Sequence, residues 1–232
     1  YMLTRKIYIS YERFFVFFIP PIQKPIRGEL VLITGAGHGI GRQLALEFAI
    51  LGARVICLDV NEGSNKAVIL TLHVRGYEAY GIKCNIGDRN EIRNMVKQVK
   101  AEYGFVSIIV NNAAVMPVGG LMDITDEDIL ETFNVNILSH FWIIKEFLPD
   151  MVERKRGHVV AISSMCGVSG VADMATYCST KFAIRGLMEA AAEEVRMMGL
   201  EDRIFFTTAF PFMWTQVWHR TRITDFRGCS LP

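Results

Sequence analysis

Short runs of apolar, β-branched residues alternate with longer amphipathic stretches from residue 29 onward, and this alternation limits the fold more than any other feature. Each run is apolar throughout rather than at every second position, which is typical of strands buried on both faces of a sheet. Strands are predicted at residues 29–34, 54–58, 79–84, 106–110, 158–163 and 204–209. Helices are predicted at residues 40–51, 64–75, 89–103, 127–153 and 175–198. This order predicts an α/β fold with a doubly wound parallel sheet of six strands.

The overall charge and the cysteine pattern argue against two classes of function. Lys and Arg number 25 against 24 Asp and Glu, which leaves a net charge of +1 and no strongly basic face for a nucleic-acid backbone. The 5 cysteines are widely spaced and form no Cys-x-x-Cys pair or Cys/His cluster. We therefore expect no nucleic-acid partner and no metal site, and we expect a reducing, intracellular compartment.

Residues 1–28 differ in character from the rest of the chain. The run 14–19 is strongly apolar, with charged residues before it and two prolines after it. Spanning a bilayer takes roughly 20 apolar residues, so this run alone is too short. It could form a helix packed on the domain, but its exposed phenylalanines favour a segment that lies at a membrane surface. We predict that residues 1–28 associate with a membrane.

The sequence TGAGHGIG at residues 34–41 joins the first predicted strand to the first predicted helix. Glycines in this position allow a tight turn and a close approach to a pyrophosphate, which the free N–H groups of the helix N-terminus then bind. A glycine-rich turn can also be purely structural, but its position between strand and helix favours nucleotide binding. The predicted cofactor contacts are Gly35, Gly37, His38, Gly39, Ile40 and Gly41, with His38 as a spacer rather than a catalyst.

Asp59 ends the second predicted strand. An acid at this position of a Rossmann-type sheet binds the ribose hydroxyls of adenosine and repels a 2′-phosphate, so we predict NAD rather than NADP as the cofactor. Two other interpretations stay open. Asp59 could be an ordinary turn residue, and Arg42 could attract the additional phosphate of NADP.

Tyr177 and Lys181 lie four residues apart in a predicted helix, so their side chains share one face. A tyrosine with an ordinary pKa of about 10 is a poor base near neutrality. A lysine ammonium one turn away stabilises the phenolate and makes proton transfer feasible. The spacing alone is common on solvated helices and gains its meaning only from the residues around it.

Taken together, the motifs resemble those of the short-chain dehydrogenase/reductase family over residues 29–216. They occur in the family's order and spacing: TGAGHGIG (34–41), NNAA (111–114), Asn136, ISS (162–164) and YCSTK (177–181). The resemblance implies that Tyr177 is the general acid/base, that Ser164 rather than Ser163 holds the substrate oxygen, and that Lys181 lowers the tyrosine pKa and binds the nicotinamide ribose.

The same resemblance assigns further roles. Asn136 would hold a water in a proton relay to Lys181, although an Asn inside an apolar helix could instead bind a neighbouring carbonyl. Asn111 would steady the central strands. The implied additional cofactor contacts are Asn85, Ile86, Asn112, Ala113 and Pro211.

Within the family, the stretch SHFWIIKEFLPDMVERKRGHVVAISS resembles the branch of retinol and 17β-hydroxysteroid dehydrogenases. Members of that branch attach to endoplasmic reticulum or lipid droplets through an apolar N-terminal segment, which implies the same location here. The implied reaction is hydride transfer between NAD and a lipophilic alcohol or its carbonyl. Family members commonly dimerise through the two long helices, so we also expect a homodimer.

The sequence departs from the family pattern in two regions. Asn85 stands where an Asp usually contacts adenine, and Ala114 replaces a usual Gly. After Pro211, Phe212 takes the place of a Gly, and we recognise no seventh strand or substrate-covering helix in the irregular tail, residues 217–232. An alternative function is therefore a catalytically impaired, membrane-associated nucleotide-binding or scaffold protein. Epimerisation on the same fold is a weaker third option, because it usually needs a larger substrate domain.

Overall fold

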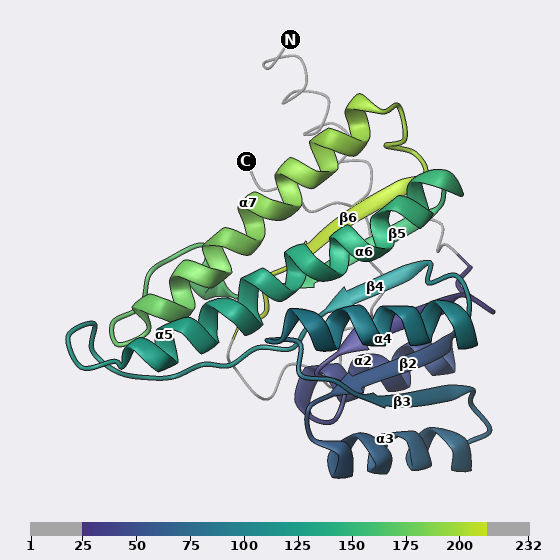
Figure 1. Cartoon of the computed structure of the whole chain (residues 1–232), viewed down its shortest axis with the longest axis horizontal. Helices are drawn as coiled ribbons and strands as arrows, with labels where there is room; N and C mark the ends of the chain where they lie inside the picture. Colours follow the sequence, from purple (N-terminus) through teal and green to yellow (C-terminus); the bar gives the residue numbers. More distant parts are fainter. Residues whose placement is uncertain (1–24, 213–232) are drawn as a thin grey trace, which may run out of the picture.

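The computed structural model of the chain describes residues 25–212, which form a parallel sheet with helices on both faces (Figure 1). The six strands of this part lie in the order β3-β2-β1-β4-β5-β6, and every neighbouring pair is parallel. They are β1 (Leu30–Thr34), β2 (Arg54–Asp59), β3 (Ala79–Lys83), β4 (Ile108–Asn111), β5 (Gly157–Ile162) and β6 (Ile204–Ala209). The strand order reverses between β1 and β4, which is where ligands bind in folds of this type.

The helices are α2 (Gly39–Ile50), α3 (Glu62–Val74), α4 (Arg89–Glu102), α5 (Asp126–Phe133), α6 (Ser139–Glu153) and α7 (Ala175–Met197), with two short turns, η1 (Asn134–Leu138) and η2 (Met165–Gly167). Helices α2 and α3 cover one face of the sheet and α4, α6 and α7 the other. In β1, Val31 and Ile33 pack toward α2 and α3, whereas Leu30 and Leu32 pack on the opposite side. A strand buried on both faces needs apolar residues at every position, which explains the unbroken runs in the sequence.

The predicted doubly wound parallel sheet is confirmed, and most boundaries agree within two residues. Strand β6 coincides with its predicted range, and β4 begins two residues later than expected. Helices α3, α4 and α7 are each followed by a glycine with positive φ that turns the chain back toward the next strand: Gly76, Gly104 and Gly199.

The prediction of a single long helix over residues 127–153 is wrong in one respect. The π-helical turn η1 interrupts it, so that α5 and α6 are separate segments on either side of Asn136. Thr125 caps the start of this region, since its Oγ1 accepts a hydrogen bond of 3.1 Å from the Asp128 N–H. A π turn inserts one additional residue into the helix and often marks a functional position.

Residues 213–232, which include the predicted tail, and all but the last four residues of the predicted membrane-associating segment lie outside the described part of the chain. Of those last four, Gly28 donates a backbone hydrogen bond of 2.8 Å to Gly52 O and Ile26 packs on the core beneath α2. Within residues 25–212, no helix combines the length and the apolar character that crossing a membrane requires.

Candidate active and cofactor-binding site

The loop between β1 and α2 has a conformation and a packing that only glycine satisfies. Gly35 and Gly39 have φ values of +65° and +54°, in the left-handed region that side chains rarely adopt. A Cβ atom on Gly41 would overlap the carbonyl oxygen of Gly35 and lie 2.6 Å from the Asn112 amide nitrogen. The loop therefore folds back tightly on itself and brings its backbone to the surface between β1 and β4.

The first turn of α2 suits an anion. No side chain caps this helix, and its first turn contains no acidic residue. The uncapped N–H groups and the positive end of the helix dipole are the features that bind a pyrophosphate. The predicted cofactor residues His38 and Ile40 flank Gly39 here, and the His38 side chain is 84% exposed without capping the helix. The residues present thus fit the phosphate groups of a dinucleotide.

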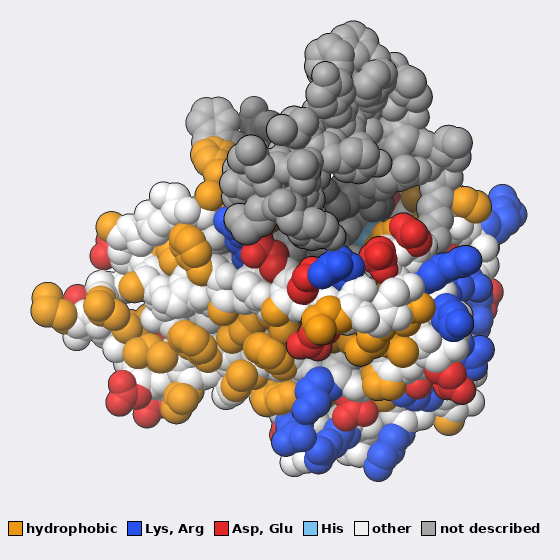
Figure 2. All heavy atoms as spheres, turned by 90° about the horizontal axis from the view of Figure 1, so that it is seen from above, with side chains coloured by type: hydrophobic (Ala, Val, Ile, Leu, Met, Phe, Trp, Pro, Cys, Tyr) orange, Lys and Arg blue, Asp and Glu red, His pale blue; other side chains and the backbone are white. Residues whose placement is uncertain are grey.

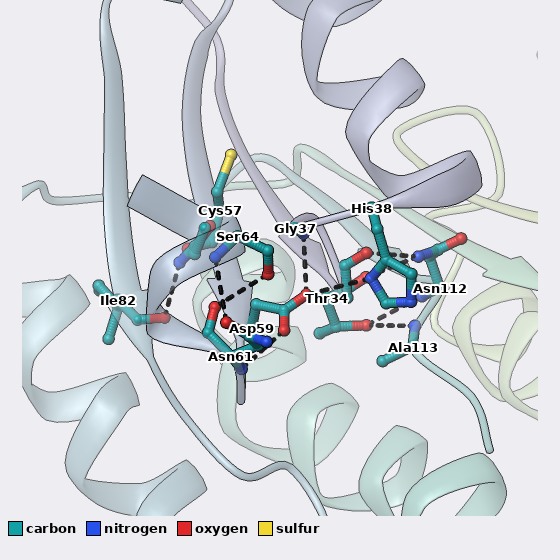
Figure 3. Close-up of polar contacts among 12 residues, drawn as sticks. Thr34, Gly37, His38, Cys57, Asp59, Asn61, Ser64, Ile82, Asn112 and Ala113 are labelled. Atoms are coloured by element: carbon teal, nitrogen blue, oxygen red, sulfur yellow. Dashed lines mark hydrogen bonds and ion pairs between the residues drawn. The ribbon is translucent and has the colours of Figure 1, made fainter. Parts of the chain in front are cut away.

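Asp59 lies at the carboxyl end of β2, with only 5% of its surface exposed, and its carboxylate faces the glycine loop (Figure 3). Its Oδ2 accepts a hydrogen bond of 2.8 Å from the Gly37 N–H, and its Oδ1 accepts one of 2.8 Å from the Asn61 N–H. The His38 Nδ1 atom is 3.9 Å from Oδ2. Arg42, the residue that could favour NADP, is exposed on α2.

A second set of contacts joins the glycine loop to β4 (Figure 3). Thr34 Oγ1 accepts hydrogen bonds from the N–H groups of Asn112 (2.9 Å) and Ala113 (3.0 Å). The Asn112 side-chain amide donates to the carbonyl oxygens of Thr34 (2.9 Å) and Gly35 (3.2 Å). Asn112, predicted as a cofactor contact, is thus the residue that steadies the central strands.

The strand-steadying role expected of Asn111 is wrong. Asn111 is the last residue of β4, only 1% exposed, and neither polar atom of its side chain has a hydrogen-bond partner among the described residues. It lies two residues after Ile109, which packs in the core toward α4, α6 and α7, so its side chain points to the same face of the sheet. Asn112 follows the end of the strand, where its side chain is no longer held to this alternation and reaches β1.

Asn85 and Ile86, both predicted as cofactor contacts, follow β3. The Asn85 side chain is exposed, and its Oδ1 accepts a hydrogen bond of 2.9 Å from the Gly87 N–H. Ile86 is buried in the core, with 6% of its surface exposed. An Asp could accept the same bond, so the local turn does not require the Asn. The structure thus gives Asn85 a role in forming the turn between β3 and α4.

Lys181 is buried on α7, with 2% of its surface exposed, and its Nζ donates a hydrogen bond of 2.9 Å to the carbonyl oxygen of Ile162 at the end of β5. The same nitrogen lies 5.4 Å from the centre of the Tyr177 ring. Burial lowers the pKa of Lys181 to about 8, because the ammonium loses hydration. At neutral pH the side chain remains mostly charged and close to the phenol.

Ser164 lies two residues after the end of β5 and is 4% exposed, with Oγ accepting a hydrogen bond of 3.1 Å from the Cys166 N–H. Burial raises the pKa of Tyr177, and a hydrogen bond with the Ser164 side chain opposes that shift. The neighbouring Ser163 uses its hydroxyl to bind the Lys181 carbonyl oxygen at 2.9 Å. The two serines therefore differ in environment, and Ser164 is the one beside Tyr177. Pro211 lies nearby, with its carbonyl oxygen accepting from the Met165 N–H at 3.2 Å.

Asn136 is fully buried in η1, where its side chain is occupied by protein atoms. Oδ1 accepts from the Val115 N–H and Nδ2 donates to the Val115 carbonyl oxygen, both at 2.8 Å, and Nδ2 also lies 3.2 Å from Thr180 Oγ1. Asn136 therefore does bind a neighbouring carbonyl, which was the structural alternative for this residue. Thr180 precedes Lys181, so Asn136 links the loop after β4 to the turn of α7 that carries the lysine.

The sequence profile of the short chain dehydrogenase family matches residues 29–210. The chain belongs to this family.

Named relatives agree with this result. The human protein 17-beta-hydroxysteroid dehydrogenase 13 is 41% identical over 198 residues, which are 85% of this chain and 66% of the relative. This short chain dehydrogenase thus spans just under two thirds of that relative's length. Solved structures include a metagenomic short-chain oxidoreductase with NADP (TM-score 0.76, 31% identity, 81% of this chain and 84% of that one) and a Burkholderia phymatum short chain dehydrogenase/reductase with NAD (TM-score 0.78, 27% identity, 82% and 67%).

Sequence reasoning missed three polar residues of this short chain dehydrogenase. Thr34 holds the start of the segment after β4, and Ser64 on α3 faces the glycine loop beside Asp59. His140 lies one turn after Asn136, is 1% exposed, and leaves Nδ1 without a partner among the described residues. Burial and the nearby Lys181 charge lower the pKa of His140 to about 3. A histidine within the apolar stretch FNVNILSHFW was the available signal for His140, and Thr34 stood at the start of the glycine-loop motif without an assigned role, whereas Ser64 carried no signal.

Proposed function

We propose that this chain is an NAD-dependent oxidoreductase that moves a hydride between NAD and the carbon of a lipophilic alcohol or its carbonyl. The observation that supports it most is the meeting of Ser164, Tyr177 and Lys181 at the carboxyl end of β5, with the Lys181 ammonium 5.4 Å from the Tyr177 ring. The glycine loop and Asp59 lie at the same edge of the sheet, across the point where the strand order reverses.

The proposed chemistry divides the proton and the hydride between two groups. In the oxidative direction the Tyr177 phenolate accepts the hydroxyl proton of the alcohol, while the Ser164 hydroxyl donates a hydrogen bond to the same oxygen. NAD, when bound, supplies the acceptor for the hydride. Burial alone disfavours the phenolate, so the Lys181 ammonium has to offset that cost. Asn136 holds the loop and helix around this group and would position a relay water.

Asp59 supports NAD over NADP. A 2′-phosphate on the adenosine ribose would meet a buried carboxylate, His38 lies 3.9 Å from that same carboxylate, and Arg42 is exposed on α2. The solved relatives include one NAD and one NADP complex, so this preference rests on the residues of the chain itself.

The loops beside the catalytic side chains support a lipophilic substrate. The segment after β4 exposes Val118, Leu121 and Met122, by 70%, 71% and 97% of their surfaces. The segment after η2 exposes Val171, and the two segments meet where the Gly119 N–H donates to Asp173 O at 2.9 Å. Apolar side chains grouped in this way gain free energy by covering an apolar ligand.

The test is NADH formation by the full chain with a panel of hydrophobic secondary and allylic alcohols. Tyr177→Phe removes the proton acceptor, and we expect turnover to fall by about 10²–10⁴-fold while NAD affinity stays unchanged. Tyr77→Phe, on the far side of the core, is the matched control. Silence over the whole panel together with NAD binding by calorimetry would instead favour the catalytically impaired nucleotide-binding protein.

We propose further that the protein is a homodimer and that residues 1–28 attach it to endoplasmic reticulum or lipid droplets inside the cell. The dimer is supported by three apolar side chains that are each 38–44% exposed: Leu138 on η1, Phe141 on α6 and Phe182 on α7. Figure 2 shows hydrophobic side chains gathering over the left and centre of the face viewed from above, whereas charged side chains are more frequent on its right side. A monomer in sedimentation would contradict the dimer, and unchanged vesicle flotation after deletion of residues 1–24 would contradict the attachment.

A further inference from the structure

Asp59 uses both carboxylate oxygens on backbone N–H groups from two separate segments (Figure 3). Oδ2 accepts from Gly37 in the glycine loop and Oδ1 from Asn61 before α3, each at 2.8 Å. With 5% of its surface exposed, the carboxylate makes these bonds away from bulk water, where bonds to a charged acceptor are strong.

The surroundings hold the carboxylate in this orientation. Asn61 caps α3, with Oδ1 accepting from the Ser64 N–H at 3.0 Å, and the Ser64 hydroxyl returns a bond of 3.1 Å to Asn61 O. On the other side, the Ala36 N–H donates to Leu58 O at 3.0 Å. The glycine loop is thus hydrogen-bonded both to the backbone of Leu58 and to the side chain of Asp59, the last two residues of β2.

The loop also packs directly against these groups. A Cβ atom placed on Gly37 would lie 2.5 Å from Ser64 Oγ and 2.8 Å from Asp59 Oδ2. No space separates the loop backbone from the carboxylate, so a movement of either one requires a movement of the other.

We infer that Asp59 is a positioning residue for the glycine loop, which it holds in the nucleotide-binding conformation before any nucleotide arrives. The inference deepens the proposed function, because it assigns Asp59 a role in addition to its contact with the ribose. It has a specific consequence for cofactor preference. Replacing Asp59 by Ser removes the charge that repels a 2′-phosphate, yet it also releases the loop, so the variant loses affinity for NAD and NADP together.

The first experiment needs no ligand. Amide hydrogen exchange of the full chain, resolved by NMR, compares wild type with Asp59→Ser and Asp59→Asn. We expect the Gly37 amide to exchange at least about tenfold faster in both variants, because a hydrogen bond to a charged acceptor is lost. Asn61→Ala is the matched control, since it removes the α3 cap but keeps the backbone N–H that binds Asp59.

The amides of Ile109 and Val159 in the central sheet report whether the variants remain folded. Faster exchange at Gly37 with these sheet amides unchanged supports the positioning role. Unchanged exchange at Gly37 in both Asp59 variants overturns it. Should Asp59→Ser unfold, Asp59→Asn retains one acceptor oxygen and similar volume and decides the question alone.

The second experiment separates the loop from the ribose contact by calorimetric titration with ADP and with 2′,3′-dideoxy-ADP. If Asp59 only binds the ribose hydroxyls, its substitution lowers the affinity for ADP and leaves that for 2′,3′-dideoxy-ADP unchanged. If Asp59 holds the loop, its substitution lowers the affinity for both nucleotides, by about tenfold or more. Tighter NADP binding by Asp59→Ser than by wild type would also overturn the inference. If the wild-type chain binds none of these nucleotides, the proposed function fails, while the exchange experiment still decides the role of Asp59.

Discussion

The Asn136 side chain binds both polar backbone atoms of Val115, accepting from the N–H and donating to the carbonyl oxygen at 2.8 Å each. Val115 lies in the segment after β4, and Asn136 lies in the π turn between α5 and α6. A single side-chain amide therefore supplies hydrogen-bond partners to both backbone groups of Val115, which lies in neither a strand nor a helix. The same amide reaches Thr180, which precedes Lys181.

Asn136→Leu should therefore destabilise the fold. It leaves the Val115 N–H and carbonyl without their protein partners in a partly buried position, which costs at most about 1–3 kcal/mol for each group. We expect a lower urea midpoint at unchanged slope. Asn134→Ala, in the same turn but only partly buried, is the control. Equal midpoints for the two variants would show that the Val115 contacts contribute nothing.

Lys181→Met should remove activity and yet stabilise the protein near neutral pH. The folded-state pKa of Lys181, about 8, lies below its usual 10.5, so burial of the ammonium costs stability below pH 8. Between pH 8 and 10.5 the folded state releases this proton first, and the cost of about 3 kcal/mol disappears. The gain of the variant over wild type in free energy of unfolding should shrink over that range. Lys97→Met, on the exposed face of α4, should show no such trend.

His140 should lower the free energy of unfolding as the pH falls below neutrality. Its folded-state pKa of about 3 lies below the usual 6.5, so the unfolded state takes up a proton first as the pH falls. Stability is thus complete above pH 6.5 and declines below it, by about 2 kcal/mol at pH 5. His140→Leu should flatten this decline in chemical unfolding measured from pH 7 to pH 5. Parallel curves for wild type and variant would contradict the assignment.

Gly41→Ala should abolish nucleotide binding, because its methyl group overlaps the Gly35 carbonyl oxygen and opens the loop. The control is Gly186→Ala in α7, where no atom from outside the surrounding helix backbone lies within 4 Å of the added Cβ. There we expect a gain of about 0.5–1 kcal/mol from helix propensity. Calorimetry with NAD and thermal unfolding measure the two effects. Normal NAD affinity in Gly41→Ala would place the nucleotide elsewhere.

The sheet was predictable because the long-range packing on its two faces demands a pattern that is visible locally, an unbroken run of apolar residues. In β1, alternating residues pack into two opposite cores, so the strand is apolar from Leu30 to Ile33 and can be predicted without knowledge of its partners. The π turn at Asn136 was not predictable in the same way. Its sequence keeps a helical pattern, and the reason for the additional residue lies in Val115, some 20 positions earlier in the chain.

The site was partly readable for a similar reason. The spacing of Tyr177 and Lys181 and the glycines of the loop are local features. The strand-steadying role falls to Asn112 rather than Asn111 because of the residue at which β4 ends, and strand ends are the least certain part of a sequence-based assignment. The contact of Asp59 with Gly37 joins residues 22 positions apart and carries no sequence pattern of its own.

The glycines that follow α3, α4 and α7 have a practical consequence. Gly76, Gly104 and Gly199 turn the chain at the edge of the sheet opposite to the candidate site, and nothing lies within 4 Å of a Cβ atom placed on any of them. Surface turns of this kind accept inserted sequence, because the strands on either side are held by their own ladders. An affinity tag or a fluorescent reporter inserted at these turns would leave the carboxyl edge, and with it the candidate site, undisturbed.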